Sequence, residues 1–554
     1  MNSRRAPLIV FCFAACFWPF QGIASRGPSH AEDPGLVLRE TLQPGNEEGQ
    51  ISLGTLYDPG PGVPKDEAEA VRWHLTAAAN GNAHAQFNLG LLYTLGHGVP
   101  KDAAEAARWY RKAAEQGFAA AQFNLGMMYY RGLGVPKNDA EAVRWYRKAA
   151  DQGFAPAQNS LGCAFANGHG VPKDDAEAMR WYRKSALGGD AAGQYNLGLK
   201  FESGLGVPKD GVEAARWYKK SADQGLAAAQ CHLAVKYAFG LGVTKDQVEA
   251  VRWCRKAAIQ GHPAAQYLLG LLYAKGQGVP KDEAVAVGWY RKAAEQGNVD
   301  AEFHLGRMYE TGSGIPMDEA EAVRWYRKAA DAGDAEAQRN LGVMYANGQG
   351  VPKDEAIAVG WYRKAAEQGH SYAQYRMGII YSSGQGVPKD DAEAARWFRK
   401  AADQGNAEAQ VSLGDVYIKG RGVPKDDAEA LRWYLNAAEQ GNAAAQWQLW
   451  LFYKNRDGIL MNHDDAMRWL RKSAEGGYSA AQGQLGYLHY KGDGVPKDLV
   501  RADAWFILSA EEGNEPAARW KENIETTMTA QQIAEAKSIA RTFRITQVPS
   551  TQAK

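Results

Sequence analysis

The chain has 554 residues, of which 64 are Lys or Arg and 63 are Asp or Glu, so its formal net charge is only +1. Such a balance provides no general electrostatic field that would collect nucleic acid or an anionic membrane. Composition therefore excludes partners held by bulk charge and leaves recognition to local surface.

The chain begins with the pattern of a secretory signal. Arg4 and Arg5 form a charged start, residues 8–20 are mostly apolar, and small residues lead up to Ala24. We expect a signal peptide over residues 1–24, because the apolar run is shorter than the roughly 20 residues that a membrane span needs. The mature protein is then expected to be exported without a membrane span, to the periplasm or the medium in a bacterium and to the endoplasmic-reticulum lumen in a eukaryote.

A strict period dominates the rest of the chain. After residues 25–48, expected to be a linker and an N-terminal half-repeat cap, residues 49–514 carry Trp at intervals of 36 residues without insertion or deletion. The Trp residues of this period are Trp73, Trp109, Trp145, Trp181, Trp217, Trp253, Trp289, Trp325, Trp361, Trp397, Trp433, Trp469 and Trp505. A fixed period of this length indicates one supersecondary unit that buries its apolar face by stacking on its neighbours. We expect an all-α solenoid of about 13 helical hairpins.

One repeat shows how each hairpin is specified. A first helix is predicted through residues 121–129, where apolar residues lie one turn apart. The loop over residues 132–137 contains two glycines and a proline, which predict a tight reversal. Asn138, or Asp at this place in most repeats, is expected to cap a second helix that ends near Gln152, with Glu141 completing a capping box.

The second helix is predicted to have an apolar and a charged face. Trp109 lies on the apolar stripe and is expected to fill the core. The run from Arg108 to Lys112 is expected to be exposed, with Glu105 as an ion-pair partner three residues before Arg108. This pairing favours a solvated face over a nucleic-acid site.

The repeated patterns Ala-x-x-x-Leu-Gly-x-x-Tyr, Gly-x-Gly-Val-x-x-Asp and Ala-x-x-Trp-x-x-x-Ala-Ala resemble the Sel1-like repeat family, which is related to tetratricopeptide repeats. The resemblance covers about residues 49–514. It implies a right-handed α/α superhelical solenoid that acts as an adaptor or scaffold for other proteins, without a cofactor. A cysteine-rich branch of the family carries a β-lactamase label, but this chain has Ala114 and Gln122 where that branch has cysteines that form a disulfide.

Three cysteines remain after the signal peptide: Cys163, Cys231 and Cys254. Cys231 and Cys254 fall in the two helices of one repeat, so their pairing stays open, whereas small buried thiols are the other interpretation. Three cysteines do not make a disulfide framework.

The C-terminal end departs from the repeat. Residues 505–508 are apolar where earlier repeats are charged, so a cover is required. Residues 515–546 are expected to supply it as capping helices, the last of which begins with a capping box of Thr529 and Gln532. Residues 547–554 are expected to form a disordered tail.

Comparison among the repeats separates fixed from variable positions. On the first helix, the positions of Phe123, Met127 and Tyr130 vary and share one face by i, i+4, i+7 spacing. This variable face is predicted to bind an extended or helical peptide, and packing of its aromatic residues against the adjacent repeat is the alternative. Its predicted binding residues are Phe87, Leu91, Phe123, Met127, Tyr130, Tyr195, Leu199, Glu202, Tyr267, Leu271, Phe303, Arg307, Glu310, Tyr375 and Ile379.

A further candidate lies in the one repeat that breaks the pattern. Trp447, Trp450 and Leu451 crowd its first helix, and Trp450 replaces the usual glycine. Degeneration near the end of the array and a binding site are both open interpretations.

No catalytic or metal-binding motif accompanies the repeats. The sequence contains no His-Glu-x-x-His, Cys-x-x-Cys or nucleophile-elbow pattern. The predicted function is a non-catalytic, monomeric, exported scaffold for a protein or peptide partner, with no metal, cofactor or nucleic acid. A cell-envelope enzyme or β-lactam-binding protein, and a secreted factor that engages host cells, are the alternatives.

Overall fold

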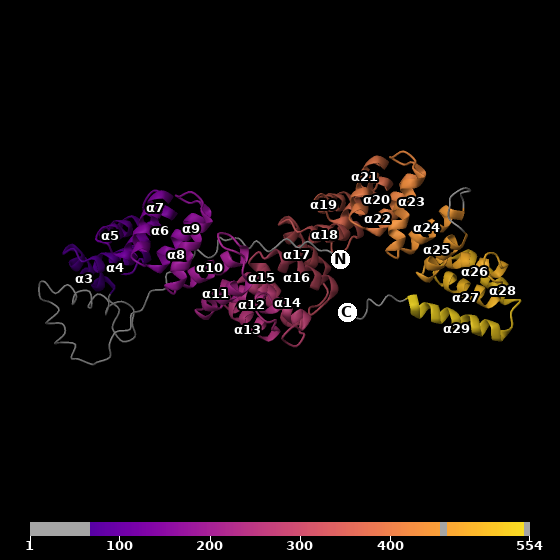
Figure 1. Cartoon of the computed structure of the whole chain (residues 1–554), viewed down its shortest axis with the longest axis horizontal. Coiled ribbons are helices and arrows are strands. Elements are labelled where there is room, and N and C mark those ends of the chain that lie inside the picture. The colour runs from indigo at the N-terminus through magenta and orange to yellow at the C-terminus, as the bar shows by residue number, and fades with distance from the viewer. Residues whose placement is uncertain (1–66, 455–462, 548–554) are drawn as a thin grey trace. The chain divides into compact units, whose positions relative to one another are not determined.

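The computed structural model describes residues 67–454 and 463–547 of the chain (Figure 1). Every regular element in these ranges is an α-helix, which confirms the all-α class. The predicted signal peptide, the linker with its half-repeat cap and the tail beyond residue 547 lie outside the described residues. The chain divides into two compact units, Met1–Asn298 and Val299–Lys554.

Helices alternate strictly between the two members of a hairpin. Even-numbered helices up to α26 are first helices, and odd-numbered helices up to α27 are second helices. The described helices of the first unit are α3 (Glu67–Ala79), α4 (Ala83–Leu95), α5 (Ala103–Glu115), α6 (Ala119–Arg131), α7 (Asp139–Asp151), α8 (Ala155–Asn167), α9 (Asp175–Leu187), α10 (Ala191–Ser203), α11 (Gly211–Asp223), α12 (Ala227–Phe239), α13 (Gln247–Ile259), α14 (Pro263–Lys275) and α15 (Glu283–Glu295). Those of the second unit are α16 (Val299–Thr311), α17 (Glu319–Asp331), α18 (Ala335–Asn347), α19 (Glu355–Glu367), α20 (Ser371–Ser383), α21 (Asp391–Asp403), α22 (Ala407–Lys419), α23 (Asp427–Glu439), α24 (Ala443–Lys454), α25 (His463–Glu475), α26 (Ser479–Lys491), α27 (Leu499–Glu511), α28 (Glu515–Glu525) and α29 (Ala530–Gln547).

The loop glycines have the conformation that the reversal requires. Gly132 and Gly134 adopt φ values of 69° and 67°, in the left-handed region. A Cβ at Gly134 would also lie 2.0 Å from the carbonyl oxygen of Ala103 in the preceding repeat. Both the backbone angle and this contact exclude a side chain, so the loop also serves the junction between repeats.

The predicted capping box forms only in half. Asn138 Oδ1 accepts the backbone N–H of Glu141 at 3.0 Å, as an N-cap does. The N–H of Asn138 instead donates to the carbonyl of Tyr129 at 2.9 Å, and Glu141 pairs with Arg144 at 2.9 Å. The reciprocal bond is absent because the preceding helix already satisfies the Asn138 N–H.

The core is built on a glycine and an aromatic ring, usually of tyrosine, that meet inside most of the described hairpins. A Cβ at Gly90 of α4 would lie 2.5 Å from Cδ1 of Tyr110 in α5, so the ring occupies the space that a side chain would need. Tyr110 is 1% exposed. The expectation that the run from Arg108 to Lys112 is exposed is therefore wrong for Tyr110, because this ring points between the two helices.

The periodic Trp packs into the core as predicted, although its depth differs between repeats. Six of these residues are buried, namely Trp253, Trp325, Trp397, Trp433, Trp469 and Trp505. Trp109 is half-buried and packs against a cluster in which Val71 and Ala77 of α3, in the preceding repeat, join Leu89 and Leu92 of α4. The ammonium of Lys112 lies 4.2 Å from its ring centroid on the solvent side. Trp109 therefore closes the junction between two repeats, while Tyr110 fills the interior of one.

Paired glutamines join the repeats through hydrogen bonds. Gln152 Nε2 donates to Gln122 Oε1 at 2.7 Å within one repeat. Gln122 Nε2 in turn donates to the carbonyl oxygen of Ala114 in the preceding repeat at 3.1 Å. Gln122 is buried, so its amide is held by two partners rather than left unsatisfied. The same pair of bonds recurs at Gln86, Gln194, Gln230, Gln266, Gln338, Gln374 and Gln410.

Two helices cover the apolar end of the array. Trp505 of α27 stacks on Phe543 of α29 with ring centroids 4.5 Å apart, and Ile507 and Leu508 are buried. Figure 1 shows α29 lying along α27 after the last hairpin. At the start of α29, Thr529 N–H donates to Gln532 Oε1 at 2.9 Å and Gln532 N–H donates to Thr529 Oγ1 at 3.2 Å, which is a complete capping box.

Trp450 is explained by the glycine–tyrosine pair. It occupies the glycine position of α24, and the tyrosine position of α25 is Leu470; both side chains are buried in one cluster. The other described hairpin without the glycine has Ala234 opposite Cys254. In both hairpins, a side chain replaces the glycine of the first helix and a residue without a ring replaces the tyrosine of the second helix.

We expect this exchange of volume to be reversible. Trp450→Gly should cost about 3–5 kcal/mol because it empties the core, and Leu470→Tyr alone should cost about 1–3 kcal/mol because it overfills it. The double variant restores the usual pair and should recover most of the loss, as measured by urea unfolding and by hydrogen exchange in α24 and α25. Purely additive losses would contradict the pairing.

A buried carboxylate makes the C-terminal cover sensitive to pH. Asp503 of α27 is fully buried, and neither of its oxygens has a hydrogen-bond partner. Burial, together with the charge of the nearby Glu525, raises the pKa of Asp503 to about 6, while Lys521 and Lys537 oppose the shift. These charged groups lie on α28 and α29, the two helices packed against Asp503.

Asp503→Val, which introduces the residue found at this place in α7 and α13, should stabilise the cover at neutral pH. Because the folded pKa lies above the ordinary value, folding binds a proton, and stability falls as pH rises from about 4 to about 6. The variant should lose this slope in unfolding curves recorded from pH 4 to 8. Glu535→Gln, at an exposed position of α29, should keep it, and an unchanged slope in Asp503→Val would refute the assignment.

Candidate functional site

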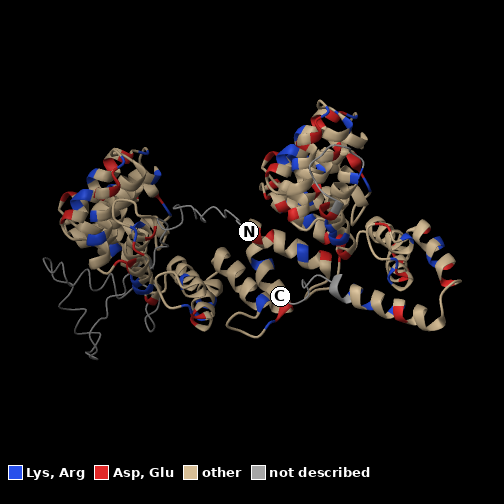
Figure 2. Cartoon of the chain, turned by 45° about the vertical axis from the view of Figure 1, so that its right-hand side comes forward, with Lys and Arg blue, Asp and Glu red and all other residues tan. Residues whose placement is uncertain are grey.

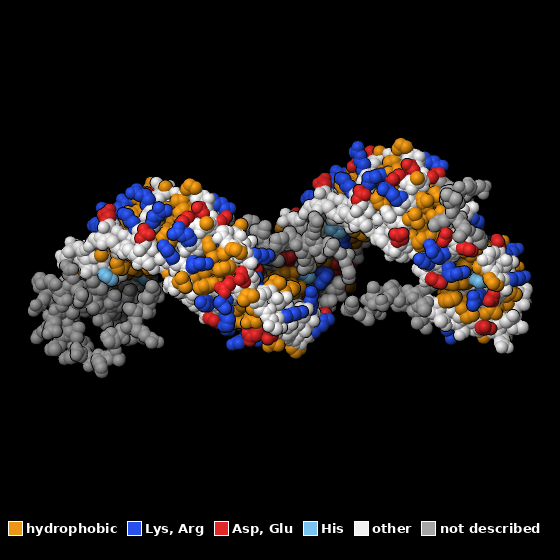
Figure 3. All heavy atoms as spheres, in the orientation of Figure 1, with side chains coloured by type: hydrophobic (Ala, Val, Ile, Leu, Met, Phe, Trp, Pro, Cys, Tyr) orange, Lys and Arg blue, Asp and Glu red, His pale blue; other side chains and the backbone are white. Residues whose placement is uncertain are grey.

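The predicted binding residues occupy one face of the first helices, but they are not equally accessible. Tyr195 and Trp450 are buried at 5% exposure each, and Arg307 is exposed. The half-buried ones are Phe87, Leu91, Phe123, Met127, Tyr130, Leu199, Glu202, Tyr267, Leu271, Phe303, Glu310, Tyr375, Ile379, Trp447 and Leu451. Figure 3 shows hydrophobic side chains reaching the surface of both units between charged ones.

The aromatic residue of this face packs on one side against its own hairpin. The ring of Phe123 lies 5.9 Å from Tyr146 of the second helix and 5.6 Å from Phe154 at the N-cap of α8, centroid to centroid. The same ring contact with the second helix recurs for Phe87, Tyr195, Tyr267, Phe303 and Tyr375. These residues therefore share their surface between packing and solvent.

The variable residues also receive the hydroxyl groups of the core tyrosines. Tyr146 Oη donates to Met127 Sδ at 3.1 Å. Tyr218 donates to Glu202 and Tyr326 to Glu310, both at 2.5 Å. The variable positions therefore also have a packing role, because the hydroxyl groups of these buried tyrosines emerge on this face and take their partners from it.

Two adjacent repeats carry buried lysines that were missed by the sequence analysis. Lys200 Nζ donates to Asp175 Oδ1 at 2.5 Å, and Lys236 Nζ donates to Glu202 Oε1 at 2.6 Å. The lysine side chains are 9% and 5% exposed. The available signal was a lysine at a position that is apolar in every other described first helix, as at Met128.

The carboxylate of Glu202 is held in its charged form. Burial alone would raise its pKa, but hydrogen bonds from Lys236 and Tyr218 outweigh this effect and lower the pKa. The neighbouring His232 has a lowered pKa because it is buried, although its Nδ1 lies 3.0 Å from the carbonyl oxygen of Ala228. The first helices α10 and α12 thus each bury a lysine, which no other first helix in the described part of the chain does.

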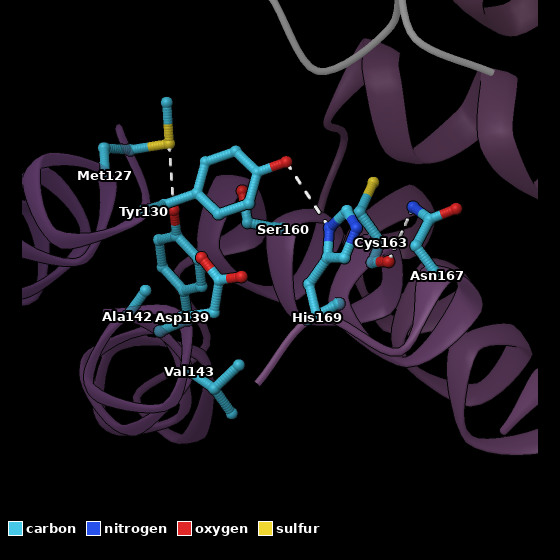
Figure 4. Close-up of a pocket in the computed structure, with 11 residues that line it drawn as sticks. Met127, Tyr130, Asp139, Ala142, Val143, Ser160, Cys163, Asn167 and His169 are labelled. Atoms are coloured by element: carbon cyan, nitrogen blue, oxygen red, sulfur yellow. Dashed lines mark hydrogen bonds between the residues drawn. The ribbon is translucent and has the colours of Figure 1, made fainter. Parts of the chain in front are cut away.

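A small pocket opens on the variable face between α6, α7 and α8. It has a volume of about 40 Å³. Its lining residues are Met127, Tyr130, Asp139, Ala142, Val143, Tyr146, Ser160, Cys163, Ala164, Asn167 and His169. Figure 4 shows Tyr130 spanning it toward His169, whose Nδ1 lies 3.4 Å from the tyrosine hydroxyl. The repeat pattern pointed to Met127 and Tyr130 but not to Asp139, which begins α7, or His169, which lies in the loop after α8.

The opposite face, on the second helices, is charged but internally paired. Arg108 pairs with Glu105 at 2.6 Å, as predicted. The same spacing recurs at Arg144, Arg180, Arg216, Arg252, Arg324, Arg396 and Arg432. Figure 2 shows positive and negative residues interspersed along both units.

The described residues contain no group of three or more His, Cys, Asp or Glu side chains placed to hold a metal ion. Cys163, Cys231 and Cys254 are free thiols, so the disulfide that the sequence left open does not form. Among the helices that the structure describes, none is both long and apolar enough to span a membrane.

Stacked helical hairpins of constant length define an α-solenoid repeat protein. The Sel1 repeat family model matches thirteen consecutive segments, at residues 47–82, 83–118, 119–154, 155–190, 191–226, 227–262, 263–298, 299–334, 335–370, 371–406, 407–442, 443–478 and 479–514. The chain therefore belongs to the Sel1 repeat family.

The chain is also similar to solved structures. A protective antigen present in uropathogenic Escherichia coli strains, with an SLR fold, is 34% identical with a TM-score of 0.63, over 87% of this chain and 97% of that one. A Sel1 repeat protein from Oxalobacter formigenes is 38% identical with a TM-score of 0.40, over 44% of this chain and 96% of that one. Curated proteins give no match.

The buried lysines provide a direct test of the polar interior. Lys236→Met should destabilise α10 to α12 by about 1–3 kcal/mol, because Glu202 loses its cationic partner. Adding Glu202→Ala, the residue at this place in α8 and α14, should recover part of the loss. Local hydrogen exchange measures both effects. Lys256→Met, on the exposed side of α13, should change stability by less than about 0.5 kcal/mol, and an equal loss there would contradict the assignment.

Proposed function

We propose that the protein is a non-catalytic, exported scaffold that binds a protein or peptide segment along the variable face of its first helices. The observation that carries this proposal is the pocketed, half-apolar face of α6 and α8, where Met127, Tyr130 and Cys163 border one cavity. A row of parallel helices with residues that differ from repeat to repeat suits an extended or helical ligand.

The paired charges of the second helices support the same choice of face. Their arginines are already engaged by glutamates one turn away, so they offer little unpaired charge to a partner. The family is one of protein-interaction scaffolds, and the similar protein from uropathogenic strains is described as a protective antigen. Export of this chain fits its charged and apolar N-terminal segment. An intact mass that corresponds to a chain starting at Ser25 would support export.

Polar substitution of the variable face should weaken partner binding without unfolding the array. Leu91→Gln, Met127→Gln and Leu199→Gln combined keep side-chain length and leave Tyr146 an acceptor, while they remove apolar contact area. Affinity for a partner captured from envelope extracts should fall at least tenfold, or about 1.4 kcal/mol, with unchanged helicity by circular dichroism.

The matched control is Leu187→Gln with Ile259→Gln. These residues end second helices, are 72% exposed each and undergo the same chemical change. Capture should survive in this control. Loss of capture in the control but not in the variable-face variant would move the binding site to the second helices and reject the proposal.

A further inference from the structure

The pocket on the variable face exists because one position of the repeat is too small. Ala164 lines it, and the equivalent residues of the flanking first helices are Met128 and Lys200. Both larger residues are buried, at 6% and 7% exposure, so they fill the space that remains open beside Ala164. The cavity is therefore the volume of one missing side chain.

The next repeat shows which chemical group fills the equivalent space. There Lys200 reaches Asp175, and its ammonium lies 2.5 Å from Oδ1 of that carboxylate. The residue equivalent to Asp175 at the pocket is Asp139, which begins α7 as Asp175 begins α9. The pocket thus retains the acidic partner of a buried lysine and lacks the lysine.

The carboxylate of Asp139 is left incompletely satisfied. Its Oδ1 is buried without a hydrogen-bond partner, and the ammonium of Lys137 is 3.8 Å away, beyond hydrogen-bond length. Figure 4 shows this carboxylate beside Tyr130 and Ser160 within the pocket. A buried acceptor of this kind gains free energy when a donor with positive charge arrives.

The aromatic lining also favours a cation. Tyr146 lines the pocket, and its equivalent Tyr218 has the ammonium of Lys236 at 5.9 Å from its ring centroid. A volume of about 40 Å³ holds roughly three groups of water size, enough for an ammonium and the methylenes next to it. The planar guanidinium of arginine is wider and fits this volume less well.

We propose that the pocket binds a primary alkylammonium group, and that a lysine side chain of the protein partner supplies it. This identity of the source rests on the proposed function, because Met127 and Tyr130 place the pocket on the predicted binding face. The pocket then acts as a specificity site, in which the partner's lysine completes the interaction that Lys200 makes within the chain.

The first test titrates the full chain with Nα-acetyl-lysine N-methylamide and with its norleucine counterpart, which has the same length without charge. Ligand-observed NMR should give a dissociation constant on the order of 1 mM for the lysine probe and binding at least tenfold weaker for norleucine. Equal binding of the two probes, or no lysine binding at about 10 mM, would overturn the proposal.

Variants assign the effect to the pocket. Asp139→Asn should remove the preference for lysine, and Ala164→Lys should abolish binding because the chain then fills its own pocket. Asp391→Asn is the matched control and should leave lysine binding unchanged. Asp391 begins α21 as Asp139 begins α7, but the larger Val416 stands at the position of Ala164. Lysine binding that persists in Asp139→Asn would assign the probe to another place.

A second readout does not depend on ligand affinity. Ala164→Lys should keep hydrogen-exchange protection of α6 to α9, because the new lysine meets Asp139. The combination of Ala164→Lys with Asp139→Asn should lose protection at least fivefold, because the ammonium is then buried without a carboxylate. Equal protection in the two proteins would show that the pocket does not recognise an ammonium.

The source of the amine is decided separately. Two results together would show that the pocket binds a small free amine rather than a lysine of the partner. Butylamine would bind the wild-type chain as tightly as the lysine probe does, and the Ala164→Lys variant would still capture the partner. A partner lost by the substitutions at Leu91, Met127 and Leu199 but retained by Ala164→Lys would preserve the scaffold proposal and reject the lysine pocket.

Discussion

The approach of two helices across a glycine is the constraint on which each hairpin depends. Without a side chain at Gly90, the ring of Tyr110 can lie against the backbone of α4, where a Cβ would be 2.5 Å from it. Dense packing of this kind tolerates little change of volume on one side alone. The described hairpins that lose the glycine, at Ala234 and Trp450, accordingly have Cys254 and Leu470 in place of the tyrosine.

The same contact determines where polar groups appear. A ring that passes between the helices must bring its hydroxyl out on the far side, and a hydroxyl there needs a partner. Met127, Glu202 and Glu310 provide it from the variable positions. At these three positions a residue that accepts a hydrogen bond therefore serves the core as well as the surface, and a binding surface built there has to keep this partner.

Variation inside the hairpin changes the surface as well. Met128, Ala164 and Lys200 occupy one position in three successive repeats and produce a filled core, a pocket and a buried ion pair. The backbone hardly needs to change, because the first-helix lengths, the loop glycines and the glutamine bond to the preceding repeat are the same in each. A repeat protein can in this way acquire a local site without losing the contacts between neighbouring repeats.

Sequence alone determined the all-α class, the hairpin boundaries and the period, because these depend on local signals that recur along the chain: helical spacing, loop glycines and N-caps. It also identified the variable face, since repeats can be compared with one another. Tertiary structure decided which side chains are buried beneath that face. Tyr110 and Trp109 are adjacent in a run that contains both charged and aromatic residues, and only the close approach of α4 shows that the tyrosine is the interior residue. The pairing of Lys200 with Asp175, and the empty place between Asp139 and Ala164, join residues 25 positions apart on different helices, and such contacts depend on packing that no local pattern encodes.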